Sequence, residues 1–346
     1  KWETSETLNI GFDASFFDNH LDLILDWWKK DTKDLLYTVQ LPGVVGNWAS
    51  SPAVNIATMN NHGVDFQIVG RGNFTEDFSF EVTLNNTFLS NEITHLTEGV
   101  DFFDTGGYRG ITPTNRNAVG QTISTFVGYT MIVYFNSQAD VDSSPSQDGK
   151  GIGRFKYEDV DGDGAITPDD RTYIGSPVAD YTGGLTLNLR YKQLTFETYW
   201  YGSYGNEVWN QQKWFTDFFG SFEGAAKGTG AFNSWTPELG NNAGAPIWES
   251  ASNLSTNGAG NSWYVEDASY IRLQRISLSY EFETAFTDRI NLKGLNVGFA
   301  ANNLWTITKY TGIDPSVGGA SDANFGIDVG NYPATPSFTI DLELKF

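Results

Sequence analysis

The sequence of 346 residues predicts an all-β protein, specifically part of a transmembrane antiparallel β-barrel. Two observations predict this fold. Apolar and polar residues alternate with period two in about nine segments, and the connections between these segments alternate between short and long. Barrels that span a membrane have short turns at one end and long loops at the other, whereas a soluble sandwich has no reason for this pattern. Aromatic strand ends such as Trp200 and Trp305, and the apolar last residue Phe346, further favour lipid as the surrounding medium.

The predicted strands follow from the alternation in chain order. The clearest is 78–88, where Phe78, Phe80 and Val82 face one side while Ser79 and Glu81 face the other. The last segment, 336–346, has an equally regular apolar face. The full set of predicted strands is 8–16, 21–37, 64–68, 78–88, 185–189, 194–200, 270–282, 295–301 and 336–346.

The long connections are predicted at 38–61, 97–182, 205–267 and 306–335. If Phe346 ends at the periplasmic side, strand parity makes all four of them extracellular. The range 120–136 looks partly like a strand, but a further crossing there would invert everything before it, so we interpret it as loop structure outside the membrane. Open sheet edges are forbidden in hydrocarbon, and nine strands without a partner for the first cannot close. We therefore expect this chain to be an incomplete piece of a larger barrel.

Composition excludes several classes of protein. The chain has no cysteine, which rules out a disulfide framework, and no apolar run long enough for a transmembrane helix. It carries 42 Asp and Glu against 21 Lys and Arg, a net charge of −21, which argues against nucleic acid as a partner. His20, His62 and His95 have no catalytic motif around them, so we expect no enzymatic activity.

An acidic segment inside the 97–182 excursion has the spacing of a twelve-residue calcium loop. Counted from Asp159, oxygen ligands fall at positions 1, 3, 5, 7, 9 and 12, with Gly164 at the sharp turn. Aspartates spaced two residues apart repel one another unless a hard cation is bound. The alternative is an Asp/Gly-rich turn held by hydrogen bonds from the backbone to side chains. The predicted ligands of a structural calcium ion are Asp159, Asp161, Asp163, Ala165 (through its carbonyl), Thr167 and Asp170.

The second long excursion, 205–267, is rich in aromatic residues. Such rings stack on sugars, bury against a partner or pack the loop's own small core, and the packing roles are the favoured interpretation. The candidates for contact with a substrate or partner are Trp209, Trp214, Trp235 and Trp248.

The chain resembles the C-terminal part of SusC/RagA-like TonB-dependent transporters. The segments that carry the resemblance are spread over the whole chain in the family's order. They are 8–13, 33–36, 159–175 (DVDGDGAITPDDRTYIG), 265–273 (VEDASYIRL), 302–306 (NNLWT) with 312–315 (GIDP), and the ending 332–346.

The resemblance implies a 22-stranded barrel in the cell outer membrane, with a plug domain and a TonB-contacting segment that we expect to be absent from this chain. It implies active import of oligosaccharides or peptides, driven by the TonB system. It also implies a SusD-like surface lipoprotein that closes over loops 97–182 and 205–267. Two alternatives remain open at this point: a soluble calcium-binding extracellular β-sandwich that binds carbohydrate, and a calcium-dependent glycan hydrolase.

Overall fold

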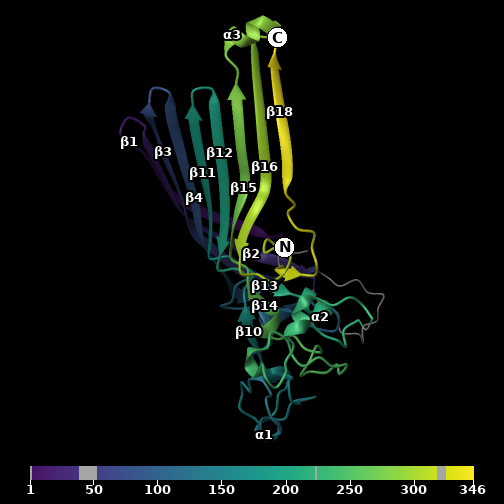
Figure 1. Ribbon diagram of the computed structural model, residues 1–346. Helices are drawn as coiled ribbons and strands as arrows, with labels where there is room; N and C mark the ends of the chain where they lie inside the picture. The colour runs from purple at the N-terminus through teal and green to yellow at the C-terminus, as the bar shows by residue number, and fades with distance from the viewer. Residues whose placement is uncertain (1, 39–52, 223, 318–324) are drawn as a thin grey trace.

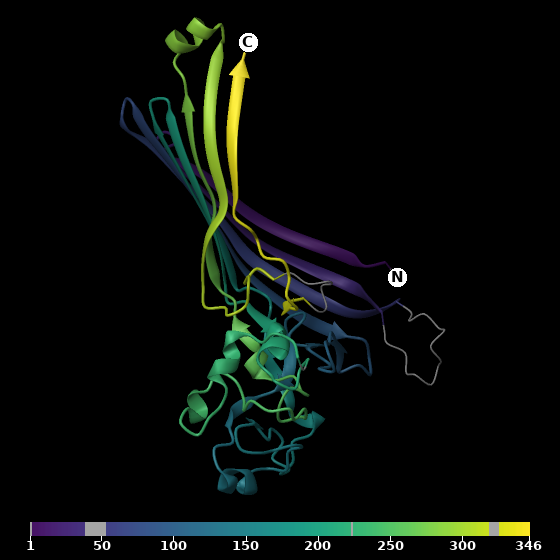
Figure 2. The same ribbon diagram turned by 45° about the vertical axis from the view of Figure 1, so that its right-hand side comes forward.

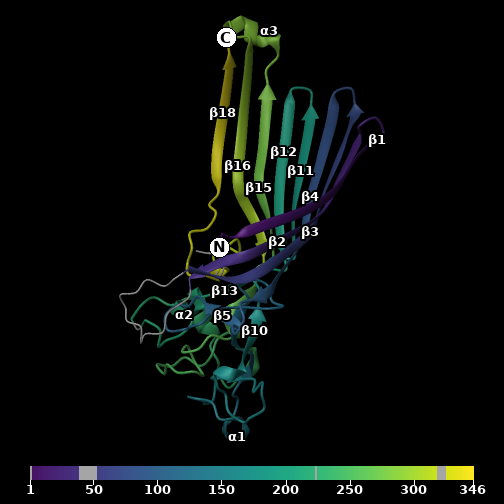
Figure 3. The ribbon, with the colours of Figure 1, turned by 180° about the vertical axis from the view of Figure 1, so that it is seen from behind.

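The computed structural model describes residues 2–38, 53–222, 224–317 and 325–346. Nine strands form one sheet, in which each strand pairs antiparallel with the next in the order β1-β2-β3-β4-β11-β12-β15-β16-β18 (Figure 1). β1 and β18 are therefore the two edges of the sheet, as the view from behind also shows (Figure 3). The all-β prediction and the nine strands of the main sheet are confirmed for the described residues.

The strands of the main sheet are β1 (Thr4–Phe16), β2 (Leu21–Thr38), β3 (Ala53–Thr75), β4 (Phe78–Leu96), β11 (Tyr181–Tyr191), β12 (Leu194–Tyr204), β15 (Tyr270–Glu281), β16 (Gly294–Thr308) and β18 (Ser337–Lys345). The other strands are β5 (Phe102–Thr105), β6 (Asn115–Ala118), β7 (Phe126–Tyr129), β8 (Met131–Tyr134), β9 (Phe155–Tyr157), β10 (Arg171–Gly175), β13 (Glu207–Asn210), β14 (Val265–Asp267) and β17 (Ile327–Asp328). The α-helices are α1 (Gln138–Ser143), α2 (Gln212–Thr216) and α3 (Thr284–Thr287). Short 3₁₀ helices are η2 (Pro168–Asp170), η3 (Thr229–Asn233), η4 (Gly240–Asn242), η5 (Ser262–Tyr264) and η6 (Asp288–Ile290).

Short and long connections lie at opposite ends of the sheet (Figure 1). The turns β1–β2, β3–β4 and β11–β12 lie at the end where β18 finishes, together with α3 in the connection β15–β16. In the first of these turns Phe17, Asp18 and Asn19 all adopt a left-handed backbone, with φ between 54° and 67°. The predicted alternation of connection lengths is confirmed, because it places every long excursion at one end.

Several strands are longer than predicted. β3 begins at Ala53 and β4 continues to Leu96, so part of the predicted loop 38–61 is strand. These extensions are less regular in polarity, so period-two alternation did not reveal them; backbone pairing with β2 and β4 forms them instead. Positions 39–52 of that loop and 318–324 of the loop 306–335 lie outside the described residues. Within 120–136, β7 and β8 belong to small separate sheets, as expected for loop structure.

One face of the main sheet is apolar and exposed. Strand register aligns Phe196, Leu278, Phe299 and Ile340 across β12, β15, β16 and β18. The exposed fractions of the last three are 44%, 46% and 79%. A row of large apolar side chains on the outside is what a lipid-facing barrel surface requires. It excludes the sandwich alternative, whose strands would bury this face against a second sheet.

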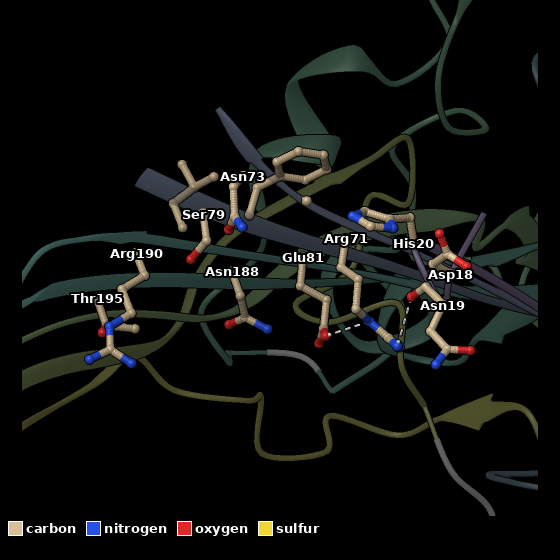
Figure 4. Close-up of a pocket in the computed structure, with 13 residues that line it drawn as sticks. Asp18, Asn19, His20, Arg71, Asn73, Ser79, Glu81, Asn188, Arg190 and Thr195 are labelled. Atoms are coloured by element: carbon tan, nitrogen blue, oxygen red, sulfur yellow. Dashed lines mark hydrogen bonds and ion pairs between the residues drawn. The ribbon is translucent and has the colours of Figure 1, made fainter. Parts of the chain in front are cut away.

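The opposite face is polar and charged. Arg71 on β3 forms ion pairs with Asp22 of β2 (2.7 Å) and Glu81 of β4 (3.3 Å). Near the short turns this face has a cavity of about 470 Å³, where Arg71 extends between Glu81 and Asn19 (Figure 4). A polar face beside an apolar one on every strand matches the lumen of a barrel.

The long connections fold together at the other end of the sheet, below it in Figure 2. We call residues 97–180 and 205–269 the loop assembly. Its core contains large aromatic side chains from both excursions, so the two segments support each other. The buried members of this core are Ile111, Phe126, Tyr129, Tyr134, Phe155, Tyr157, Ile166, Trp209, Phe218, Trp235, Ala259 and Tyr264. None of the described helices is long and apolar enough to cross a membrane.

Candidate functional site

The acidic segment connects β9 to β10 and is a compact turn built on its own side chains. The Asp159 carboxylate accepts hydrogen bonds from the backbone N–H groups of Gly162 (2.8 Å) and Gly164 (2.9 Å). Both glycines have positive φ, 74° and 86°, which a residue with a side chain rarely adopts. The sequence DGDG therefore folds here because glycine supplies the turn and aspartate supplies the acceptors.

Asp170 closes this loop from its far end. Its side chain is fully buried, and its two oxygens accept hydrogen bonds from the N–H groups of Val160 (2.8 Å) and Thr167 (2.7 Å). Thr167 in turn caps η2, because its hydroxyl accepts from the N–H of Asp169 (3.2 Å). Asp170 thus joins both ends of the twelve-residue segment.

Three of the six predicted ligands meet in the structure. Single carboxylate oxygens of Asp159, Asp161 and Asp170 all lie within 4.8 Å of one another. Asp163 is engaged instead with the N–H of Ala165 (2.7 Å). The loop therefore has both the hydrogen bonds of an Asp/Gly turn and the converging carboxylates of a cation site.

The exposed carboxyl of Asp161 is affected most by this convergence. A hydrogen bond from the N–H of Asp163 lowers its pKa, but partial desolvation and the negative charges of the neighbouring aspartates outweigh that bond. The pKa of Asp161 consequently lies above its ordinary value. A bound cation would relieve the same repulsion.

The four predicted tryptophans divide into buried and accessible ones. Trp209 has no exposed surface and Trp235 is 6% exposed, so for these two the structure favours the packing role over direct contact. Trp214 is partly buried against Phe215 and Phe222, whereas Trp248 is 39% exposed and touches Phe219 at a ring-centroid distance of 5.6 Å. Of the four predicted contact residues, Trp214 and Trp248 are the more accessible.

An arginine surrounded by aromatic rings was not predicted. The guanidinium carbon of Arg109 lies 4.8 Å from the ring centre of Phe222 and 5.7 Å from that of Phe215. Arg109 has a φ of 54°, so its backbone is held in an unusual conformation beneath this contact. Sequence alone gives no sign of it, because Arg109 and these rings lie more than 100 positions apart.

A polar cavity of about 510 Å³ in the loop assembly was also not predicted. It lies where β13 passes into α2 and where residues 228–230 and 311–313 approach. The buried Asn210 and the partly buried Lys213 and Asp217 supply polar groups to it, and no motif connects them in sequence.

No family model matches the chain. Over its whole length the chain is 32% identical to TonB-dependent receptor P3 of Formosa agariphila and 28% identical to TonB-dependent receptor SusC of Bacteroides thetaiotaomicron. It covers 34% and 32% of those two proteins. The solved structure of the RagAB peptide transporter matches the whole chain with a TM-score of 0.80 at 23% sequence identity, over 35% of that chain. The chain thus spans about a third of the length of the relatives that it matches.

The nine-stranded sheet, apolar on one face and polar on the other, is part of a membrane-spanning β-barrel. Within that class, the chain is similar over its whole length to TonB-dependent receptors, SusC among them, which confirms the family resemblance read from its motifs. The named relatives are receptors and a transporter, which fits the expectation of a protein without enzymatic activity.

Proposed function

We propose that the protein containing this chain is a TonB-dependent active transporter of the outer membrane that imports oligosaccharides or peptides. The strongest support is the similarity to TonB-dependent receptors over the whole length of this chain, together with a sheet whose apolar face is exposed. In this proposal the apolar face contacts outer-membrane lipid and the polar face lines the import path. The loop assembly lies at the extracellular mouth, where substrate arrives.

A SusD-like lipoprotein is the proposed partner, and it would close over the loop assembly. Exposed rings of Phe222 (48%), Phe219 (40%) and Trp248 (39%) lie on this assembly, together with Arg109. Aromatic and arginine side chains supply most of the binding energy in many protein interfaces. The loop assembly therefore exposes the residue types that a tightly closing lid requires.

The function is tested by uptake in cells that carry the full-length protein. Fluorescent oligosaccharides and peptides are supplied separately, and we expect one class to enter in an energy-dependent manner. A proton uncoupler should then reduce entry to the level of cells that lack the protein, and a surface lipoprotein should co-purify with the receptor. Uptake that is insensitive to the uncoupler would contradict active transport.

We also propose that the acidic loop holds a structural calcium ion. The support is the ligand spacing from Asp159 to Asp170 and the convergence of three carboxylates within 4.8 Å. Asp163, the Ala165 carbonyl and Thr167 would complete an oxygen shell of the kind that calcium prefers. The ion would connect the two ends of the segment and so fix its position above β9 and β10.

Calcium is expected to stabilise the loop assembly of the wild-type receptor against proteolysis and heat. Saturation at 100 times Kd corresponds to about 2.7 kcal/mol. Asp161→Asn should remove this protection, because it deletes one converging carboxylate without disturbing the core. The matched control Asp148→Asn changes an exposed aspartate of the same assembly and should leave the protection intact. If EDTA and calcium give the same melting curve for wild type, the loop is only a hydrogen-bonded turn.

A further inference from the structure

The polar cavity beside α2 is unusual in the charges that line it. Lys213 is paired with Glu266 at 2.9 Å and also donates to the carbonyl of Trp263 at 2.8 Å, so its charge is already compensated. Glu266 additionally accepts hydrogen bonds from the N–H and hydroxyl of Thr311, both at 2.8 Å. This pair contributes no net charge to the cavity.

Asp217 is the charge that remains. Its Oδ1 accepts a hydrogen bond from the Thr216 hydroxyl at 2.7 Å, and no cation forms an ion pair with it in the described part of the chain. Burial raises the pKa of the Asp217 carboxyl above its ordinary value, although Thr216 and Lys213 act in the opposite direction. A half-buried carboxylate with a single hydroxyl donor is an incomplete arrangement, because buried charges are normally paired.

The side-chain amide of Asn210 is a second polar group at this cavity whose hydrogen bonding is incomplete. Its side chain is 2% exposed and lines the cavity, and its Nδ2 donates to Glu266 at 3.0 Å, which fixes the orientation of the amide. The other end of that amide, Oδ1, has no hydrogen-bond donor among the described residues. Buried polar atoms without partners are uncommon in folded proteins. Among the described residues, the Asn210 Oδ1 thus has no donor and the Asp217 carboxylate has a single one, from the Thr216 hydroxyl.

The size and lining of the cavity restrict the missing group. A volume of about 510 Å³ is far larger than a single metal ion needs and falls in the usual range for small organic ligands. Among the described residues that line it, none has an aromatic side chain on which a neutral sugar ring would stack. Its other lining groups are mainly hydroxyls, amides and glycine backbone, which suit a polar ligand rich in hydrogen-bond donors.

We propose that this cavity binds a primary ammonium group of a small organic ligand, with Asp217 as its charge partner. An ammonium offers three donors and one positive charge, which matches the carboxylate and the surrounding acceptors. Free peptides and amino sugars both carry such a group. The inference rests on the proposed import function only for the origin of the ligand, since binding itself is measured on the purified receptor.

Calorimetry on the full-length receptor in detergent tests the proposal. The probes are triglycine and glucosamine, each compared with its N-acetylated form. We expect at least one free amine to bind, and acetylation to weaken that binding by about tenfold to a hundredfold, as for loss of a hydrogen bond to a charged group. Binding of triglycine alone identifies peptides as the source, and binding of glucosamine alone identifies amino sugars.

Two variants connect the result to the cavity. Asp217→Asn keeps the shape of the side chain and should remove the preference for the free amine, so that both forms bind equally. Gly230→Ala places a methyl group 2.6 Å from the Asp217 Oδ2, which forces the carboxylate to move and should weaken the same preference. The control Glu238→Gln changes an exposed carboxyl of the same assembly and should leave it unchanged.

Failure of the ammonium site and failure of the transport function give different results. Equal binding of free and acetylated probes to wild type, no binding of either amine, or an unchanged preference in Asp217→Asn would overturn the proposal. Failure of energy-dependent uptake would instead contradict the transport function and leave these binding results as they are. Unaltered thermal midpoints of the variants check that loss of binding is not loss of folding.

Discussion

Replacing Leu278 by arginine is expected to destabilise the barrel in lipid by up to about 4 kcal/mol, because a charge on the lipid-facing side costs about 2–4 kcal/mol at the bilayer midplane and less toward the interfaces. Leu278 is 44% exposed and lies on β15 between Phe196 of β12 and Phe299 of β16. The charge would therefore enter a continuous row of apolar side chains. Equilibrium unfolding in urea of the full-length receptor, reconstituted in lipid vesicles, measures the change.

The matched control is Ser279→Arg, one position further along the same strand. The register pairs Ser279 with Thr195 of β12 and Gly298 of β16. Its side chain lies on the polar face, beside Gly298 and on the same side as Asp341 of β18. We expect it to change the free energy of unfolding far less than Leu278→Arg does. If the two variants were equally destabilised, or if their order were reversed, the assignment of the lipid-facing side would be wrong.

Truncating Trp209 to alanine is expected to destabilise the loop assembly by about 3–5 kcal/mol, as for other fully buried aromatic residues. Trp209 has no exposed surface, stacks on Tyr264 at 5.4 Å with a 2° interplanar angle, and meets Phe126 edge to face at 6.1 Å. The variant would leave a cavity where the two long excursions meet. Hydrogen exchange of the receptor should show faster exchange in β7 and β13, with the nine-stranded sheet still protected.

Trp248→Ala is the comparison for this second prediction. Trp248 is 39% exposed, and in the described part of the chain its one ring contact is with Phe219, so its truncation should cost little stability. Its effect is expected instead on partner or substrate contact. Equal exchange rates in wild type and Trp209→Ala would show that the loop assembly does not depend on this core.

The main sheet was largely predictable because its signal is local. Side chains alternate sides along a strand, so residues such as Phe78 and Ser79 report their faces through immediate neighbours alone. The lengths of the connections then fixed the end at which each strand turns. Strand ends such as Ala53 and Leu96 were misplaced because backbone pairing continues where the alternation of polarity weakens.

The convergence of the aspartates in the acidic loop was also predictable, because this signal is local too. Asp159, Asp161 and Asp170 are close in sequence, and their spacing forecast that they would converge. The spacing did not reveal that Asp170 is buried and accepts two backbone hydrogen bonds, nor that Asp163 points to Ala165 instead. Those details depend on how the turn packs against the rest of the assembly.

By itself, the sequence determined the all-β barrel character, the two faces of the sheet, the family and the acidic turn, all of which follow from local alternation and contiguous motifs. Only the tertiary structure decided which tryptophans are buried and which polar groups lie without partners. Asn210 and Asp217 share a cavity with Thr311 although about 100 positions separate them from it. Contacts between such distant segments come from the packing of one long connection, 205–269, against another that follows β16, and no local pattern in the chain encodes them.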